Sequence, residues 1–410
     1  MTLDLLPEPS GSNVGVHITR DALRHIRAGH PWIWDGSIER ISGTGQLGDL
    51  AVVFDEKRKF AAIGLYDPES PIVVRLLHHG SPRSIDDHFF ADRVTDAIAK
   101  RQRIADNDQT SAWRLIHGEN DQLPGLVVDR YATTLVVRLD TLAWLPHLRS
   151  IVDALTQIEE PTSIVLRTSR QISASLPPGL SSGTTLVGPA PVAPIEFVEN
   201  GLLFEADVIK GQKTGHFLDQ RDNRQLVASR CHGATVLDVF CNTGGFTVHA
   251  AAAGARRITS VDISEHAIDA TRRHVELNRD ETAATEHSYI TADAFDAMER
   301  LANEGARFDV VIVDPPSFAP NAAALAGARR AYRRLTSLAI ELLGSGGTLF
   351  QASCSSRIDN IEFHDLVADE IDRAGFVAAN AIRTEHCLDH PIGFAQGAYL
   401  KALLADLQPR

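Results

Sequence analysis

The sequence lacks the features that mark secreted, membrane-spanning and metal-binding proteins. Its four cysteines form no C-x-x-C pair and no regular spacing, so we expect reduced thiols and a cytoplasmic protein. The first residues carry neither a basic nor an apolar segment, so we expect no signal peptide. No apolar run approaches the ~20 residues that a membrane-spanning helix needs. The 17 histidines form no H-E-x-x-H motif and no Cys/His cluster, so we expect no metal site.

The chain also lacks an excess of positive charge. It has 40 Lys and Arg against 53 Asp and Glu, which gives a formal net charge of −13 at pH 7. This balance argues mildly against a protein that binds polyanions without specificity. Evidence for a nucleic-acid substrate must therefore come from motifs. With 410 residues, 44% of them hydrophobic, the chain is long enough for two or three globular domains.

Turn residues and apolar runs divide the chain into four parts. Residues 1–80 hold short strand patterns between turn signals, which predicts a small β-barrel. Residues 82–176 mix strands with helical patterns, including a long one over 85–107, and predict an α+β domain. Residues 177–194 are rich in Pro, Gly, Ser and Thr and are expected to form a linker. Residues 195–410 alternate strands with helices, which predicts a parallel sheet covered on both faces and ending in an antiparallel hairpin.

The most informative stretch is 235–262. An apolar run ends at Asp238, a glycine turn and an alanine-rich helix follow, and a second strand ends at Asp262. An acid about 20 residues beyond the turn completes the layout of a nucleotide-binding βαβ unit. The turn is not G-x-G-x-x-G, however, and a pyrophosphate needs a tighter cradle of amides. Two glycines better suit a ligand without phosphates, such as S-adenosylmethionine (SAM). The alternative is a turn that only packs a helix on the sheet.

Four acids are expected where strands end, the place at which open α/β sheets bind ligands. They are Asp238, Asp262, Asp293 and Asp314. Asp262 would bind the ribose hydroxyls of SAM, and Asp293 the adenine amino group. Asp314 precedes two prolines that restrict its backbone, so its rigid carboxylate would grip the amino edge of a target base. The alternative for Asp314 is a loop that merely ends the strand.

Cys354 follows the fifth strand, which lies about 5 Å from the fourth. It should therefore face the same cleft as Asp314. Cytosine C5 is a poor nucleophile, and thiolate addition at C6 converts it into an enamine that can attack a sulfonium methyl. Such chemistry needs an activated cysteine and an acid near N3, which predicts catalytic roles for Cys354 and Asp314. Cys241, inside the glycine turn, is interpreted as packing.

Two other groups are open to two interpretations. Trp32 and Trp34 fit the core of the N-terminal domain better than a ligand platform. Four arginines within 329–334 share one helical face, which is either solvated or able to grip phosphates.

Several stretches resemble the ribosomal RNA large-subunit methyltransferase I family, whose members are cytosine-C5 methyltransferases. They span nearly the whole chain and are HPWIWDGSI, RLIHGENDQLPGLVVDRY, KTGHFLDQRDNR, DVFCNTGGFTVHAA, VDPPSF, SCS and DHP…GAYLK. The resemblance implies a PUA-like RNA-binding domain over 1–80, a bridging domain over 82–176 and a Rossmann-like class I methyltransferase domain over 195–410. It also implies Cys354 as the nucleophile. SAM contacts implied by the resemblance are Gln220, Asn242, Thr243, Gly244, Gly245 and Phe246.

The leading hypothesis is a SAM-dependent methyltransferase that modifies C5 of a cytosine in 23S ribosomal RNA. Such enzymes usually need the target base unstacked, which suits a separate domain that holds the flanking RNA. One alternative is a methyltransferase of the same fold that acts on another RNA position or on a small molecule. A second is a non-catalytic RNA-binding factor. No membrane partner is expected, and a homodimer is compatible with the sequence.

Overall fold

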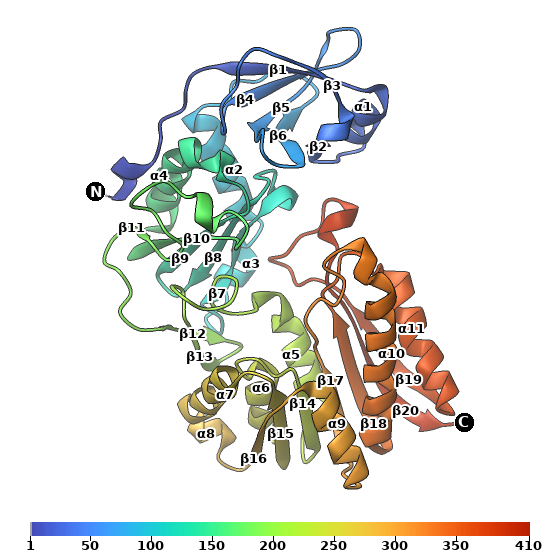
Figure 1. The fold of residues 1–410 in the computed structure, drawn as a ribbon. Helices are drawn as coiled ribbons and strands as arrows, with labels where there is room; N and C mark the ends of the chain where they lie inside the picture. Colours follow the sequence, from blue (N-terminus) through green and yellow to red (C-terminus); the bar gives the residue numbers. More distant parts are fainter. Residues whose placement is uncertain (1) are drawn as a thin grey trace. The chain divides into compact units, whose positions relative to one another are not determined.

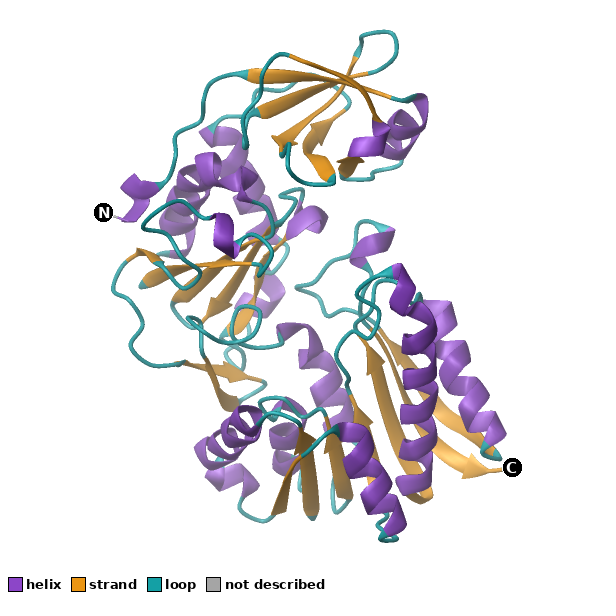
Figure 2. Ribbon diagram, in the orientation of Figure 1, coloured by secondary structure: helices purple, strands orange, loops and turns teal. Residues whose placement is uncertain are grey.

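The computed structural model describes residues 2–410, which form two compact units assembled from discontinuous parts of the chain. The first comprises the chain up to Val198 with Glu205–Leu218 and Leu388–Ala395. The second comprises Glu199–Phe204, Asp219–Cys387 and Gln396–Arg410. Both contain helices and sheets (Figure 2). Within residues 2–410, no helix has both the length and the apolar composition that crossing a bilayer requires.

The first unit begins with a six-stranded sheet in the order β2-β6-β5-β4-β1-β3. β1 and β4 are parallel, and the other neighbours are antiparallel. Val14, Val16 and Ile18 alternate along β1 and are fully buried, so one face of the sheet packs against α1. The elements are β1 (Asn13–Ile18), α1 (Arg20–Arg27), β2 (Trp32–Trp34), β3 (Ile38–Ser42), β4 (Leu50–Phe54), β5 (Phe60–Tyr66) and β6 (Ile72–His79).

The two tryptophans of β2 do not both lie in the core. Successive side chains of a strand point to opposite faces, and Ile33 takes the inward position. Trp34 is 42% exposed, so the core position expected for it is wrong. Trp32 is partly buried, and its indole Nε1 donates a 2.8 Å hydrogen bond to Glu119 Oε1.

A five-stranded sheet follows, in the order β11-β10-β9-β8-β7, over a core that includes the fully buried Trp144. The helical pattern predicted over 85–107 is divided into α2 and α3. Residues 177–194, expected to be a linker, contribute strand β11, whose Val187 pairs with Ile164 of β10. The elements are α2 (Asp87–Ala99), α3 (Gln102–Ala105), β7 (Ala112–His117), β8 (Leu126–Tyr131), β9 (Thr134–Leu139), α4 (Leu148–Glu159), β10 (Ser163–Thr168) and β11 (Thr185–Val187).

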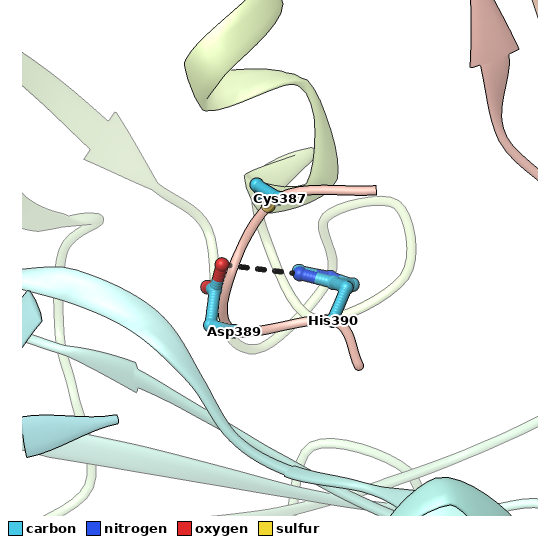
Figure 3. A group of neighbouring side chains, drawn as sticks. All are labelled: Cys387, Asp389 and His390. Carbon is cyan, nitrogen blue, oxygen red and sulfur yellow. Dashed lines mark ion pairs between the residues drawn. The ribbon is translucent and has the colours of Figure 1, made fainter. Parts of the chain in front are cut away.

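A buried ionic network anchors a C-terminal loop in the first unit. Arg101, between α2 and α3, turns its guanidinium inward and pairs with Asp121 at 2.7 Å. Another Arg101 N–H donates to the main-chain oxygen of Asp389 at 2.9 Å. The Asp389 carboxylate accepts the Arg114 amide at 2.9 Å. Figure 3 shows Asp389 beside His390, with 3.4 Å between the carboxylate and the imidazole.

The second unit contains a seven-stranded sheet in the order β16-β15-β14-β17-β18-β20-β19. β14 to β18 are parallel, and β20 runs antiparallel between β18 and β19. Helices α9, α10 and α11 cover one face, and α5 and α6 cover the other (Figure 1). Leu237 packs into the first layer and Val236 into the second, because neighbouring side chains alternate. The predicted fold class is confirmed.

The central strands β14 and β17 of the second unit are nearly all buried, and α6 is buried over most of its length. A two-stranded sheet of β12 (Ile195–Glu199) and β13 (Leu202–Ala206) precedes it, with Asn200 and Gly201 at positive φ as the predicted hairpin needs. The remaining elements are α5 (Arg221–Ala228), β14 (Thr235–Val239), α6 (Gly245–Ala252), β15 (Arg257–Asp262), α7 (Glu265–Leu277), α8 (Arg279–Thr282), β16 (Glu286–Thr291), α9 (Ala294–Asn303), β17 (Phe308–Val313), α10 (Leu325–Leu342), β18 (Leu343–Ser353), α11 (Asn360–Arg373), β19 (Phe376–Thr384) and β20 (Lys401–Pro409).

The final strand pair differs from the simple hairpin that the sequence predicts. β19 and β20 pair antiparallel as expected, but residues 385–400 separate them, and Leu388–Ala395 belongs to the first unit. A long loop rather than a short turn therefore connects the two strands.

Candidate active site

The structure brings the four predicted acids to one edge of the seven-stranded sheet. Asp238 lies in β14, Asp262 ends β15, Asp314 directly follows β17, and Asp293 comes two residues after β16. These strands are parallel neighbours, so their carboxyl ends meet along a single edge. That is where an open α/β sheet binds its ligand.

Asp262 holds the glycine turn in place. One carboxylate oxygen accepts the amide of Asn242 at 3.0 Å, and the other accepts the amide of Ser264 at 2.9 Å. Asn242 has a φ of 50°, a left-handed conformation that few residues other than glycine and asparagine adopt readily. The acid at the end of the second strand therefore shapes the turn at the end of the first.

The two glycines of the turn are explained by helix packing. Gly244 has a φ of 78°, and a Cβ there would lie 2.5 Å from Thr271 Cγ2 on α7. A Cβ on Gly245 would lie 2.4 Å from Nε of Arg224 on α5. Arg224 is itself fixed by a buried ion pair with Glu199 at 2.6 Å. Packing against helices thus accounts for both glycines. The evidence for a ligand at this edge of the sheet must therefore come from the acids.

Asp238 is a buried carboxylate with unused hydrogen-bonding capacity. One oxygen accepts the Thr247 hydroxyl at 2.7 Å, and within residues 2–410 the other has no hydrogen-bond donor. Burial raises the pKa of Asp238 to about 6. An incompletely compensated negative charge at the sheet edge attracts a cationic ligand, because charges interact strongly where water is excluded.

Asp293 is exposed and caps helix α9. Its Oδ1 accepts the amides of Phe295 at 2.9 Å and Asp296 at 3.3 Å. These bonds fix the direction of the Asp293 carboxylate at the N-terminus of α9.

Cys354 and the loop of Asp314 lie together at the other half of the edge. Val313 pairs with Gln351 in the parallel β17–β18 ladder, which places both strand ends side by side. The Cys354 thiol is 3.7 Å from the main-chain oxygen of Pro315. The juxtaposition expected from strand order is therefore present in the structure.

Gln220 supports Asp314 through a contact that the sequence did not reveal. Its amide nitrogen donates to Asp314 Oδ1 at 2.9 Å, and its oxygen accepts from Asn223 at 2.5 Å. Asn223 in turn accepts the Thr384 hydroxyl at 2.6 Å. Gln220 is 3% exposed, so both ends of the amide serve to orient the carboxylate of Asp314.

Lys401 was also missed, although it lies in the closing GAYLK stretch. It begins β20, is 1% exposed, and its ammonium donates to the main-chain oxygens of Ser355, Ile358 and Tyr399. The oxygens of Ser355 and Ile358 belong to the loop that follows Cys354. A lysine inside an apolar strand run was the available signal, because lysine is seldom fully buried without a role.

Cys354 differs from the other cysteines in its exposure. It is partly exposed, whereas Cys231, Cys241 and Cys387 are buried. Burial raises the pKa of Cys231 to about 12 and that of Cys241 well above its ordinary value. The buried environment of Cys241 agrees with its interpretation as packing.

The arginines within 329–334 favour a solvated helix face. Arg329 pairs with an acid on α11, Arg333 with two acids on α11 at 2.8 and 3.1 Å, and Arg334 with an acid on α9. Such surface pairs hold neighbouring helices and leave these charges partly neutralised.

Comparison with known proteins identifies the family. A model described as S-adenosylmethionine-dependent methyltransferase matches residues 114–405, and a PUA-like domain model matches residues 16–79. A ribosomal RNA large subunit methyltransferase from Deinococcus radiodurans is 40% identical over 98% of this chain and 99% of its own. The ribosomal RNA large subunit methyltransferase I of Vibrio vulnificus is 34% identical over 95% and 98%. The chain belongs to the ribosomal RNA large subunit methyltransferase I family.

Solved structures agree with this assignment at the level of the fold. A SAM-dependent methyltransferase from Streptococcus mutans has a TM-score of 0.82 at 20% identity, over 96% of this chain and 99% of that one. A second structure with the same score is of a methyltransferase complexed with SAH. The strand order of the methyltransferase sheet, with its antiparallel β20, is that of the class I enzymes.

SAM is the cofactor of this methyltransferase. The residues at the sheet edge fit it, since SAM carries sulfonium and ammonium charges and the edge presents the undercompensated carboxylate of Asp238 beside Asp262. When bound, SAM supplies an electrophilic methyl group.

Proposed function

We propose that this methyltransferase methylates C5 of a cytosine in 23S ribosomal RNA, with Cys354 as nucleophile and Asp314 as the acid at N3. The observation that carries the proposal is the place of the one partly exposed thiol among the four cysteines, 3.7 Å from the carbonyl beside Asp314. The relatives are named as ribosomal RNA large subunit methyltransferases, which supports large-subunit RNA as the substrate.

The half of the sheet edge formed by the ends of β14, β15 and β16 is called the cofactor half. It would hold SAM between the glycine turn and the acids. Asp262, already fixed by two amides, would accept the ribose hydroxyls, and Asp293 would accept the adenine amino group. Asp238 would favour the cationic end of the ligand by its charge. The residues assigned to this half are Gln220, Asp238, Asn242, Thr243, Gly244, Gly245, Phe246, Asp262 and Asp293.

The reaction would begin with addition of the Cys354 thiolate to C6, which forms an S–C6 bond. The displaced electron pair is taken up as Asp314 protonates N3, and C5 becomes nucleophilic. C5 then forms its bond to the methyl group of SAM. A base removes the C5 proton, N3 returns its proton to Asp314, and the S–C6 bond breaks to release the thiolate. The net products are 5-methylcytosine, SAH and one proton.

The remainder of the chain would hold the RNA. A target base must leave its stack to reach the sheet edge, so the flanking nucleotides need a separate grip. The PUA-like domain over residues 1–80 and the bridging domain over 82–176 are assigned that task. The exposed indole of Trp34 supports this, because a free base can stack on such a ring.

The decisive variant is Cys354→Ala. Transfer of tritiated methyl from SAM to ribosomal RNA should fall by at least ~10³-fold, because no other group can form the bond to C6. SAM affinity, measured by calorimetry, should stay within about twofold. Cys241→Ala is the matched control, since it also removes a thiol from the second unit and should retain methyl transfer.

A trapped adduct tests the covalent step directly. RNA with 5-fluorocytidine at the target has no C5 proton to lose, so the S–C6 bond should persist and survive denaturation. Peptide mapping should place the adduct on Cys354. Methyl transfer by Cys354→Ala to an atom other than C5 would instead indicate a same-fold enzyme with another target, and absence of SAM binding would indicate a non-catalytic RNA-binding factor.

A further inference from the structure

Lys401 occupies an unusual place for a lysine. It is the first residue of β20 and pairs with Ser353, the last residue of β18, in an antiparallel ladder. Directly opposed residues in such a ladder have Cα atoms about 5 Å apart. Lys401 therefore sits beside the strand end that carries Cys354, yet its side chain is only 1% exposed.

The ammonium of Lys401 is held by neutral acceptors. It donates to the main-chain oxygens of Ser355 and Ile358, and to that of Tyr399 at 3.1 Å. Among residues 2–410, no carboxylate forms an ion pair with it within 4.0 Å. Removing a charge from water without a counter-ion is costly, so this cation favours an anion at the nearest site that can supply one.

Cys354 directly precedes Ser355, whose main-chain oxygen accepts from the ammonium, and it acts on Lys401 more strongly than Asp359 and Glu362 do. The loop from Cys354 to Ile358 turns around the ammonium, while the thiol itself reaches the carbonyl of Pro315. Burial lowers the pKa of Lys401 to about 8, and Cys354 opposes that shift. The effect is mutual, because an ammonium that is stabilised by a thiolate stabilises the thiolate in turn.

We infer that Lys401 is a positioning residue for Cys354: its buried ammonium fixes the loop that carries the thiol and favours the thiolate form. The inference rests on the proposed function for the importance of the thiolate in catalysis, but the effect on the thiol can be measured without catalysis.

Other charged and titratable groups surround this pair and remain unchanged in the test below. Tyr332, on α10, donates to or accepts from Ser353 at 2.8 Å, and burial raises its pKa. Asp359 caps α11 and binds the amide of Glu362 at 2.8 Å. Asp359 and Glu362 act on Lys401, Lys401 acts on His364, and both Cys354 and Asp314 act on Tyr332.

The test is the pH dependence of thiol alkylation by iodoacetamide in the full chain. Cys354 is the partly exposed cysteine, so it should be labelled first, and Cys354→Ala identifies its signal. In Lys401→Met, the midpoint of the labelling rate against pH should rise by about one unit, which corresponds to about tenfold slower labelling at pH 7. In Lys401→Arg the midpoint should stay close to that of the unsubstituted protein, because arginine keeps the positive charge.

Two controls separate this effect from a general loss of structure. Arg257→Gln removes an exposed positive charge at the start of β15, which pairs with Glu286 at the start of β16, and should leave the midpoint unchanged. Lys401→Gln provides a second neutral side chain if Lys401→Met does not fold, as judged by thermal unfolding. An unshifted midpoint in a folded neutral variant would overturn the inference.

The outcome is independent of the proposed reaction. If Cys354→Ala retains methyl transfer while Lys401→Met shifts the labelling midpoint, the proposed function fails and the interaction stands. If the midpoint does not move but Cys354→Ala is inactive, the nucleophile stands and Lys401 has only a packing role.

Discussion

The two halves of the methyltransferase sheet are built in different ways. In the cofactor half, Asp262 accepts amides 20 and 2 residues away, and Asp293 accepts those of the helix it caps. In the half that holds Cys354, contacts join distant parts of the chain: Asp314 to Gln220, a residue also assigned to SAM, over 94 residues and Ser355 to Lys401 over 46. Local contacts shape the cofactor site, whereas the target-base site exists only when the whole sheet has formed.

Among substitutions that should affect one half of the sheet and not the other, Asp262→Ala should have the largest effect. SAM affinity should fall about 10–100-fold, because hydrogen bonds to a charged acceptor contribute roughly 1.5–3 kcal/mol and the Asn242 amide also loses its acceptor. Calorimetry measures the affinity, and alkylation of Cys354 should keep its rate. Asp269→Ala on the exposed face of α7 is the control. Slower alkylation in Asp262→Ala would show that the halves are not independent.

A smaller effect is expected from Gly244→Ala. A Cβ would meet Thr271 Cγ2 at 2.5 Å, and the residue's φ is 78°, so the free energy of unfolding should fall by about 1–3 kcal/mol. Gly233→Ala is the matched control, because its φ is 70° and its Cβ would meet open space. Urea denaturation of both variants separates backbone strain from crowding. Thr271→Ser should recover part of the loss, and equal destabilisation of the two glycine variants would contradict the packing explanation.

The smallest effect concerns pH and Asp238. Its folded-state pKa is raised to about 6, so its contribution to stability is fully present below pH 4 and is lost as pH rises through 6. A cationic ligand favours the ionised form, and SAM affinity should therefore weaken a few-fold as pH falls below 6. Asp238→Asn should remove this pH dependence. Calorimetry between pH 5 and 8 measures it, and an identical slope in both proteins would exclude Asp238 as its source.

The cofactor half could be predicted because its signals are local. The 28 consecutive residues 235–262 contain a strand, a glycine turn and an acid at the end of the next strand. The roles of the glycines could not be distinguished, since a turn that binds a ligand and a turn that packs against a helix look alike in sequence. Only the positions of Thr271 and Arg224 reveal the crowding that excludes a side chain.

The half of the edge that holds Cys354, where the target base would bind, could be predicted only in part. Strand order placed Cys354 beside Asp314, because parallel neighbours end at the same edge. The contacts of Lys401 could not be predicted, because they depend on the place of β20 between β18 and β19 and on the loop that follows Cys354. Trp34 was misplaced for a related reason: in a three-residue strand, composition does not say which face is inward.

The loop Leu388–Ala395 limits how this protein can be divided or recombined. It leaves the strand pair of the second unit, yet its Asp389 supplies an acceptor to Arg101 and another to Arg114 in the first. A fragment that stops at Val198 would leave both donors without these acceptors. Chimaeras between relatives should therefore exchange three stretches of chain together rather than a single N-terminal cassette.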